Sequence, residues 1–212
     1  MAQVFDYKKK YKEFYLPPAK PQVVDVPEFC MLAVDGKGNP NTAEAYQKAL
    51  EMLYGISYCI KMSRKQPEGY FDYVVAPLEG LWWLEGEAAY DGQSPSDKDQ
   101  FCWTSMIRQP EFVTESVLEG AKAELARKKP NVDTSAARLL HWKEGLCVQM
   151  MHIGSYDDEL VSVRQMETYM QEQGYRADFS SLRRHHEIYL SDPRKTVPEK
   201  LQTVIRHPVA RG

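Results

Sequence analysis

The chain spells the same succession of elements twice, and this internal repeat limits its fold more than any other feature. Residues 29–38 form an apolar run that ends in a glycine-containing turn, and residues 145–154 form another. An amphipathic segment with helical spacing of its apolar residues follows each run, at 41–62, with Asn41 as the expected N-cap, and at 155–175. Two strand-like segments then complete each half. The order strand, helix, strand, strand is therefore predicted twice.

The remaining strands follow from runs of β-branched and aromatic residues bounded by glycine, proline or polar residues. In the first half these runs cover 70–83 and 101–109, and in the second half 183–192 and 201–209. Between the halves, an amphipathic stretch at about 111–129 predicts a connecting helix. The pattern mixes antiparallel strands with helices, which is typical of an α+β fold.

We expect an α+β fold of two pseudo-symmetric strand-helix-strand-strand repeats (an SHS2 pair) with antiparallel sheets. The first repeat covers about 23–109 and the second about 140–209, within one domain at 23–212 that follows an N-terminal extension at 1–22. Each three-stranded sheet buries one face against its own helix. A ligand groove is then expected between the repeats, because concave apolar surfaces between repeats commonly hold ligands.

Charge and hydropathy exclude several classes of partner. The formal net charge is −3, which argues against a nucleic-acid or membrane-surface partner, since both require clustered basic residues. The one basic cluster, Lys8 to Lys12, precedes several prolines and predicts a solvated N-terminal arm. The sequence contains neither a membrane-length apolar stretch nor a secretion signal, so a cytoplasmic protein is expected.

Cysteine and histidine positions give no sign of a metal centre. The four cysteines are far apart and form no C-x-x-C pair, which favours buried free thiols over disulfides. His185 and His186 are adjacent in a predicted strand and so point to opposite faces, which a shared metal site would not allow. We expect no metal and no cofactor.

Period-two alternation divides the predicted strand "HHEIYL" into two faces. One face carries the apolar pair Ile188 and Leu190, which we assign to the helix-packed side. The other face therefore points into the groove and carries His185, Glu187 and Tyr189.

Aromatic residues are expected to line the same groove. The stretch "YVVAPLEGLWWLEGE" at 73–87 places two tryptophans among glutamates. The residues predicted to bind ligand are Tyr73, Glu79, Trp82, Trp83, Trp103, Trp142 and His185. Rings around a carboxylate suit flat aromatic or cationic ligands, and the acid is then a counter-ion or a general base. A tryptophan in a strand more often belongs to the hydrophobic core. Trp82 and Trp83 are adjacent, so they face opposite sides of the strand unless a bulge intervenes.

Three segments taken together resemble the GyrI-like small-molecule-binding family: "VPEFCMLAVDGKGNPN", "MHIGSYDDE" and "HHEIYLSDP". The resemblance spans about residues 20–208 and implies the paired repeat described above. Members are the ligand-sensing halves of multidrug-responsive activators, or standalone binding proteins, one type of which inhibits DNA gyrase. The ligand-contacting glutamate of the family corresponds to Glu187, with Tyr189 beside it. About 20 residues precede the first strand, too few for a helix-turn-helix, so a regulator role is not expected.

The stretch "PLEGLWW" is similar to a subset of the family, the cyclopropanoid cyclopropyl hydrolases, which open the strained ring of DNA-alkylating natural products such as yatakemycin and CC-1065. For such a ring opening we expect Glu187 to deprotonate a water and Tyr189 to donate a hydrogen bond, with Glu79 or Glu85 as the base if the hairpin folds inward. Two other functions stay open. One is a non-catalytic protein that sequesters aromatic xenobiotics, and the other is an interaction module for a partner such as DNA gyrase.

Overall fold

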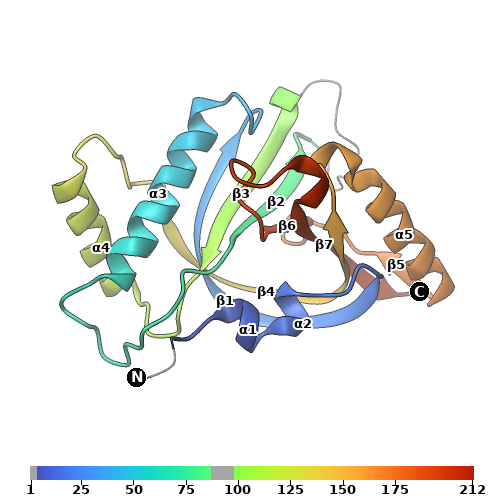
Figure 1. Ribbon diagram of the computed structural model, residues 1–212, viewed down its shortest axis with the longest axis horizontal. Helices are drawn as coiled ribbons and strands as arrows, with labels where there is room; N and C mark the ends of the chain where they lie inside the picture. Colours follow the sequence, from blue (N-terminus) through green and yellow to red (C-terminus); the bar gives the residue numbers. More distant parts are fainter. Residues whose placement is uncertain (1–3, 87–97) are drawn as a thin grey trace.

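The computed structural model describes residues 4–86 and 98–212 (Figure 1). Its first half contains β1 (Gln22–Lys37), α3 (Glu44–Lys61), β2 (Leu78–Leu84) and β3 (Phe101–Arg108). These elements confirm the predicted order of strand, helix, strand, strand in this half. Residues 70–77 are not part of a regular strand, and Ala43 rather than Asn41 precedes the first turn of α3.

The connecting helix α4 spans Glu115–Lys128 and begins at Thr114, whose hydroxyl accepts a hydrogen bond from the amide of Val117. The second half then repeats the order of the first, with elements β4 (Arg138–Ile153), α5 (Glu159–Glu172), β6 (His185–Tyr189) and β7 (Gln202–Arg211). Smaller elements that the sequence did not predict are α1 (Tyr7–Lys10), α2 (Lys12–Tyr15), β5 (Tyr175–Ala177) and the 3-10 turns η1 (Lys98–Gln100), η2 (Tyr156–Asp158) and η3 (Pro198–Lys200).

Six antiparallel strands close into a ring in the order β1, β3, β2, β6, β7, β4. The ring closes because β4 also pairs with β1, from Gln22–Gln149 to Ala33–Arg138. Within each half the first strand pairs with the last, and the last pairs with the middle one. The two halves therefore share one closed sheet and do not form two separate sheets. The long strands β1 and β4 satisfy the backbone groups of both sheet edges by pairing with each other.

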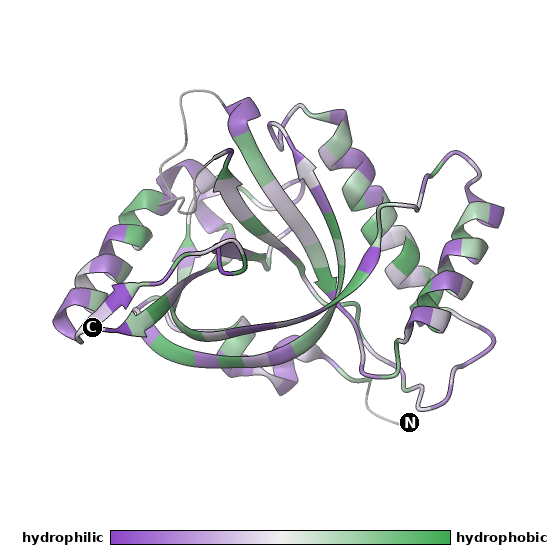
Figure 2. Ribbon diagram, turned by 180° about the vertical axis from the view of Figure 1, so that it is seen from behind, coloured by the Kyte–Doolittle hydropathy of each residue, from purple (hydrophilic) through white to green (hydrophobic). Residues whose placement is uncertain are grey.

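Helices α3, α4 and α5 lie on the outer face of this closed sheet (Figure 1), whereas Tyr15 of α2 reaches Glu79 on the inner face. Helix α3 packs on β1 and β3 and against α4, whereas α5 packs on β4 and β7. Hydrophobic and hydrophilic stretches alternate along these helices, as amphipathic elements require (Figure 2). The inner face of the sheet encloses the barrel interior, and Ile188 faces this interior with His186. Ile188 therefore shares the cavity with Phe14 and Tyr15 of α2 and does not lie on the outer face that the helix of its own half covers, because alternation alone does not reveal which element covers a face.

The N-terminal segment is not the solvated arm predicted from its lysines. Tyr7, Phe14 and Tyr15 are buried, while the lysines between them remain largely exposed. The buried Arg108 guanidinium lies over the Tyr7 ring at 4.6 Å and over the Phe29 ring at 3.5 Å. The interleaved aromatic residues, rather than the charges, therefore decide where this segment lies.

The thiols behave as predicted, with all four cysteines free. Cys59 and Cys147 are buried, and Cys30 and Cys102 are half-buried. Within residues 4–86 and 98–212, none of the helices combines the length and the apolar character needed to cross a bilayer.

Candidate functional site

A cluster of aromatic rings forms on the outer face of the sheet, beneath α3. Trp82 of β2 and Trp103 of β3 are direct cross-strand neighbours. Tyr46 of α3 meets the Trp103 ring edge-on, with centroids 5.1 Å apart, and lies 5.9 Å from the Trp82 ring. The Trp82 indole N–H donates a hydrogen bond of 2.9 Å to the Tyr189 hydroxyl. The fold thus brings three of the predicted site residues together and adds Tyr46.

Two glycines make this ring cluster sterically feasible. A Cβ atom on Gly36 would lie 2.1 Å from the Trp103 ring, and one on Gly80 would lie 2.7 Å from the Trp82 indole nitrogen. Both glycines lie within strands, where glycine has no propensity advantage and often marks a close approach. Their positions in β1 and β2 are therefore the local sequence signal that large rings cross the adjacent backbone.

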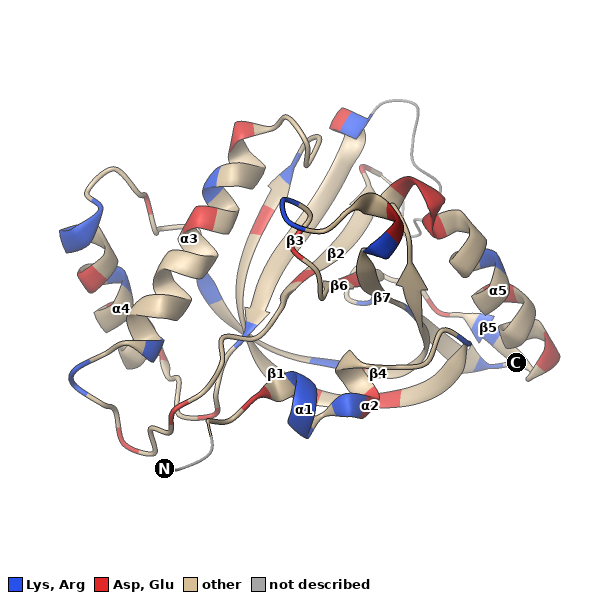
Figure 3. Cartoon of the chain, viewed as in Figure 1, with Lys and Arg blue, Asp and Glu red and all other residues tan. Residues whose placement is uncertain are grey.

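An acidic cluster lies next to the rings on the same face of β6. The His185 Nε2 atom is 3.1 Å from Oε1 of Glu187, and its Nδ1 atom is 2.7 Å from Nε2 of His207. Glu159, the first residue of α5, completes the cluster: one ligand atom from each of Glu159, His185 and Glu187 lies within 4.8 Å of the other two. All three side chains are buried. Acidic residues gather at this start of α5 (Figure 3).

Burial dominates the electrostatics of the acidic cluster. It raises the pKa of Glu159 well above the usual range, and the neighbouring Glu187 and Asp157 raise it further. Burial also lowers the pKa of His207, with His185 adding to the effect, so His207 is neutral at pH 7. The surroundings of Glu159 therefore favour the protonated form of its carboxyl group.

Sequence reasoning missed Glu159 and Tyr46. Glu159 falls in register with Val163, Met166 and Met170 on the buried face of α5. A carboxyl on an apolar helical stripe was the available signal. Tyr46 was read as ordinary core because it shares the helical spacing of the apolar residues in α3.

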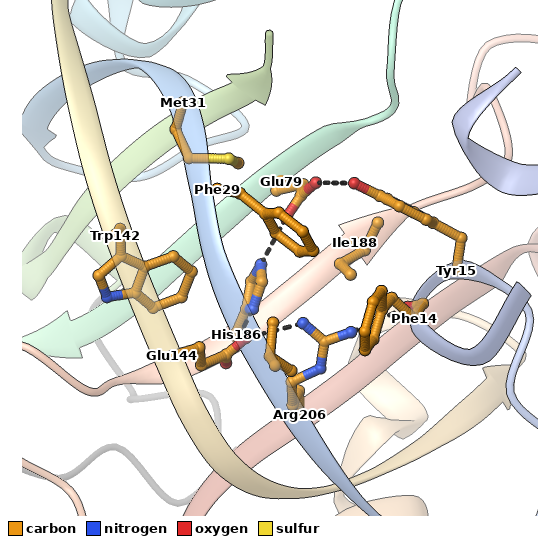
Figure 4. Close-up of a pocket in the computed structure, with 11 residues that line it drawn as sticks. Phe14, Tyr15, Phe29, Met31, Glu79, Trp142, Glu144, His186, Ile188 and Arg206 are labelled. Carbon is orange, nitrogen blue, oxygen red and sulfur yellow. Dashed lines mark hydrogen bonds and ion pairs between the residues drawn. The ribbon is translucent and has the colours of Figure 1, made fainter. Parts of the chain in front are cut away.

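A second polar network lies inside the barrel, on the opposite face of β6 (Figure 4). His186 donates from Nδ1 to Glu144 at 3.0 Å and from Nε2 to Glu79 at 3.1 Å. Arg206 donates to the other Glu144 oxygen at 2.7 Å, and the Tyr15 hydroxyl donates to Glu79 at 3.2 Å. The adjacent histidines thus point to opposite faces, as the alternation predicts.

The interior network is charge-balanced. Burial alone would lower the pKa of His186, but the flanking Glu144 and Glu79 carboxylates raise it overall, so the imidazolium form persists. Likewise, burial would raise the pKa of Glu144, but His186 and Arg206 lower it to about 2. Two carboxylates and two cations then cancel. The cavity beside them measures about 10 Å³, roughly the space of one water.

The remaining predicted ligand-binding residues lie outside the ring cluster. Glu79 belongs to the interior network, and Trp142 lies at the barrel cavity with its indole N–H donating to the Leu182 carbonyl. Trp83 is half-buried beneath the Arg184 guanidinium, opposite in orientation to Trp82. Tyr73 is buried among Phe71 and Phe112, where the N-terminal segment pairs with it. Glu85 also lies outside the ring cluster, in a loop, where it pairs with Lys37.

The expectation that the chain has no metal site rested on the separated cysteines and on the opposite orientations of His185 and His186, and it did not consider carboxylates. Within the described residues, Glu159, His185 and Glu187 form a group whose spacing could hold a cation. Two oxygen ligands and one imidazole are a donor set that many divalent ions accept. The aromatic wall beside them is equally suited to an organic cation.

The fold has counterparts among known proteins. The model of the GyrI-like small molecule binding domain matches residues 19–210. The chain belongs to the GyrI-like family. Its members are small-molecule binding domains, so ligand binding is the shared property that the family assignment brings. No curated protein matches the chain significantly.

Three crystal structures from Listeria innocua are similar to this GyrI-like protein. An uncharacterized conserved protein shares 51% identity with a TM-score of 0.91, and the match covers 97% of this chain and all of that one. Two structures described as hydrolases each share 48% identity, with TM-scores of 0.88 and 0.89; the matches cover 97% and 98% of this chain and all of each hydrolase.

Proposed function

We propose that this GyrI-like protein binds flat aromatic molecules, neutral or cationic, between α3 and the start of α5. The observation that carries the proposal is the placement of the buried Glu187 carboxylate on the same strand face as Tyr189, next to Trp82 and Tyr46. Tyr46 and Tyr189 each carry a raised pKa, to which Glu187 contributes, so both are close to this acid and neutral at pH 7. Aromatic faces attract positive charge, and a desolvated carboxylate strengthens that attraction.

Ligand entry requires the rings to separate. A flat ligand sandwiched between two rings needs about 7 Å, twice the ~3.5 Å contact distance of carbon atoms. The Tyr46 ring centroid lies only 5.1 Å from that of Trp103 and 5.9 Å from that of Trp82. Tyr156, the more exposed ring at 37%, meets Tyr189 at 5.9 Å and borders the same site. We therefore place the entry at Tyr156, with Tyr46 rotating to form an aromatic cage.

Hydrolysis of a bound cyclopropanoid is the second candidate. Two GyrI-like structures at 48% identity are described as hydrolases, which favours a reaction over simple capture. The hydrogen bond between His185 and Glu187 favours it as well, because a partner that orients a carboxylate is typical of a general base.

The reaction balances with water alone. Glu187 takes one proton from a water molecule whose oxygen attacks the cyclopropane methylene carbon. The carbon–carbon bond to the spiro centre breaks, and its electron pair moves through the dienone to form a phenolate oxygen. Tyr189 stabilises that oxygen by a hydrogen bond, and the proton returns to it to give the phenol. A general base contributes about 10²–10⁴ to such a rate.

Fluorescence titration with N-methylacridinium and neutral acridone tests binding, since neither dye changes charge between pH 5 and 9. We expect saturable binding of both, and Glu187→Gln should weaken the cation about 10- to 100-fold while changing acridone little, because a charge-assisted contact contributes about 1.5–3 kcal/mol. Glu172→Gln, on an exposed carboxylate near the end of α5, is the matched control. Absence of saturable binding of either dye would refute the proposal.

Mass spectrometry after incubation with a cyclopropanoid alkylating agent tests the chemistry. The hydrolase candidate predicts the ring-opened water adduct, which Glu187→Gln should form about 10²–10⁴ times more slowly. Recovery of unchanged ligand from a saturated complex identifies a binder without chemistry.

A further inference from the structure

Glu159 is part of the site but has no role in the general-base scheme above. It is 5% exposed, and its Oε1 atom has no hydrogen-bond partner. One of its carboxyl oxygens lies within 4.8 Å of a ligand atom of both Glu187 and His185. A buried carboxyl oxygen without a hydrogen bond, on a side chain this close to a second buried carboxyl group, is costly unless a positive group lies near the pair.

The chain supplies little positive charge to this pair. Within the described residues, the only ion pair formed by either carboxyl group is the one between Glu187 and His185. Two buried carboxyl groups so close together cannot both ionise readily, so one retains its proton. Burial and the nearby Glu187 identify that one as Glu159.

We infer that Glu159 is the residue that makes this site selective for cations: it forms a two-carboxyl cradle with Glu187 for the positive part of an aromatic ligand, and the bound cation displaces the proton of Glu159. The inference rests on the proposed ligand site. Neutral aromatic ligands use only the ring surfaces and leave the proton in place. The protein can therefore bind both cationic and neutral aromatic ligands, and the empty site does not hold two unpaired negative charges.

Most of the other titratable groups around Glu159 are not expected to release a proton when the cation binds. Tyr46 of α3, Tyr156 of η2 and Tyr189 of β6 have raised pKa values, to about 12 for Tyr156, and stay neutral at pH 7. His207 of β7 is already neutral. Asp157 of η2 is exposed and pairs with Lys98. His152 of β4 contacts Ser162 of α5, the helix that begins with Glu159. His185 is the remaining group that could exchange a proton, and the variants below distinguish it.

The direction in which cation affinity changes with pH follows from these protonation states. The empty site binds one more proton than the cation complex wherever Glu159 is protonated in the empty site. Cation affinity therefore rises about tenfold per pH unit in that range and levels off above the pKa of Glu159 in the empty site. Acridone affinity does not change with pH.

Titration calorimetry with N-methylacridinium in phosphate and in Tris measures the proton released, because the two buffers differ in ionisation enthalpy. We expect the full-length protein to release protons on binding, with the number approaching one as the pH is lowered. Glu159→Gln should still bind the dye through Glu187 but release none, and its affinity should no longer vary with pH. Glu172→Gln, an exposed carboxyl on the same helix, should behave as the parent.

Each outcome bears on the inference. Proton release that persists unchanged in Glu159→Gln assigns the proton to His185 and overturns it. Equal affinity for acridinium and acridone, with no proton released, overturns it while the proposed ligand site stands. If Zn²⁺ displaces the dye at a concentration below the dissociation constant of the dye, Glu159, His185 and Glu187 form a metal site. That result also overturns the inference. Failure of both dyes to bind removes the proposed function and the inference together.

Discussion

Replacing Arg206 by methionine tests the interior network most directly. Arg206 is 2% exposed and makes three hydrogen bonds: to Glu144 at 2.7 Å, to Gln149 at 3.0 Å and to the Phe14 carbonyl at 2.8 Å. Methionine fills a similar volume but leaves Glu144 with His186 as its only charged partner. Breaking a buried ion pair by removing one member costs about 3–5 kcal/mol.

The pH dependence of that cost follows from Glu144. Its pKa of about 2 lies below the ordinary value of 4.5, so its ionised form stabilises the folded state above pH 4.5, by about 3 kcal/mol. This contribution is lost as pH falls from 4.5 towards 2. Without Arg206 the pKa of Glu144 rises and the contribution shrinks. The stability difference between parent and variant is therefore full at pH 7 and smaller by about 2 kcal/mol at pH 3.

Urea unfolding followed by circular dichroism at pH 7 and pH 3 measures both quantities. Arg211→Met, an exposed arginine on the same strand, is the matched control and should change the free energy of unfolding by less than about 0.5 kcal/mol. A loss below about 1 kcal/mol for Arg206→Met at pH 7, or the same loss at both pH values, would show that the network does not stabilise the fold in this way.

Three further predictions concern single sites. Gly36→Ala places a methyl group 2.1 Å from the Trp103 ring and should destabilise the protein by at least about 1–3 kcal/mol in thermal unfolding; an unchanged midpoint would contradict the packing. Tyr15→Phe removes the hydrogen bond to the buried Glu79 and should cost about 1–3 kcal/mol in urea unfolding, whereas no loss would mean that Glu79 does not depend on it. Cys147 is fully buried, and burial raises the pKa of its thiol, so a disulfide reagent should label it only in urea; native labelling would refute this burial.

The sequence alone determined the elements and much of the outer site. Period-two and helical spacing predicted the repeated strand, helix, strand, strand order, because both periods follow from local backbone geometry. The same alternation placed Glu187 and Tyr189 on one face of β6, and put Trp82 and Trp83 on opposite faces of β2. These inferences need only neighbouring residues, so no knowledge of distant contacts was required.

Only the tertiary structure decided what covers each face. Pairing of β1 with β4 closes the sheet, and closure turns one face of β6 into a barrel interior where His186 needs Glu79 and Glu144. Packing of α5 onto the sheet brings Glu159 beside Glu187, 28 positions later in the chain by their residue numbers. Alternation distinguishes two faces but carries no information about their partners, because those partners are set by strand edges and helices far away in sequence.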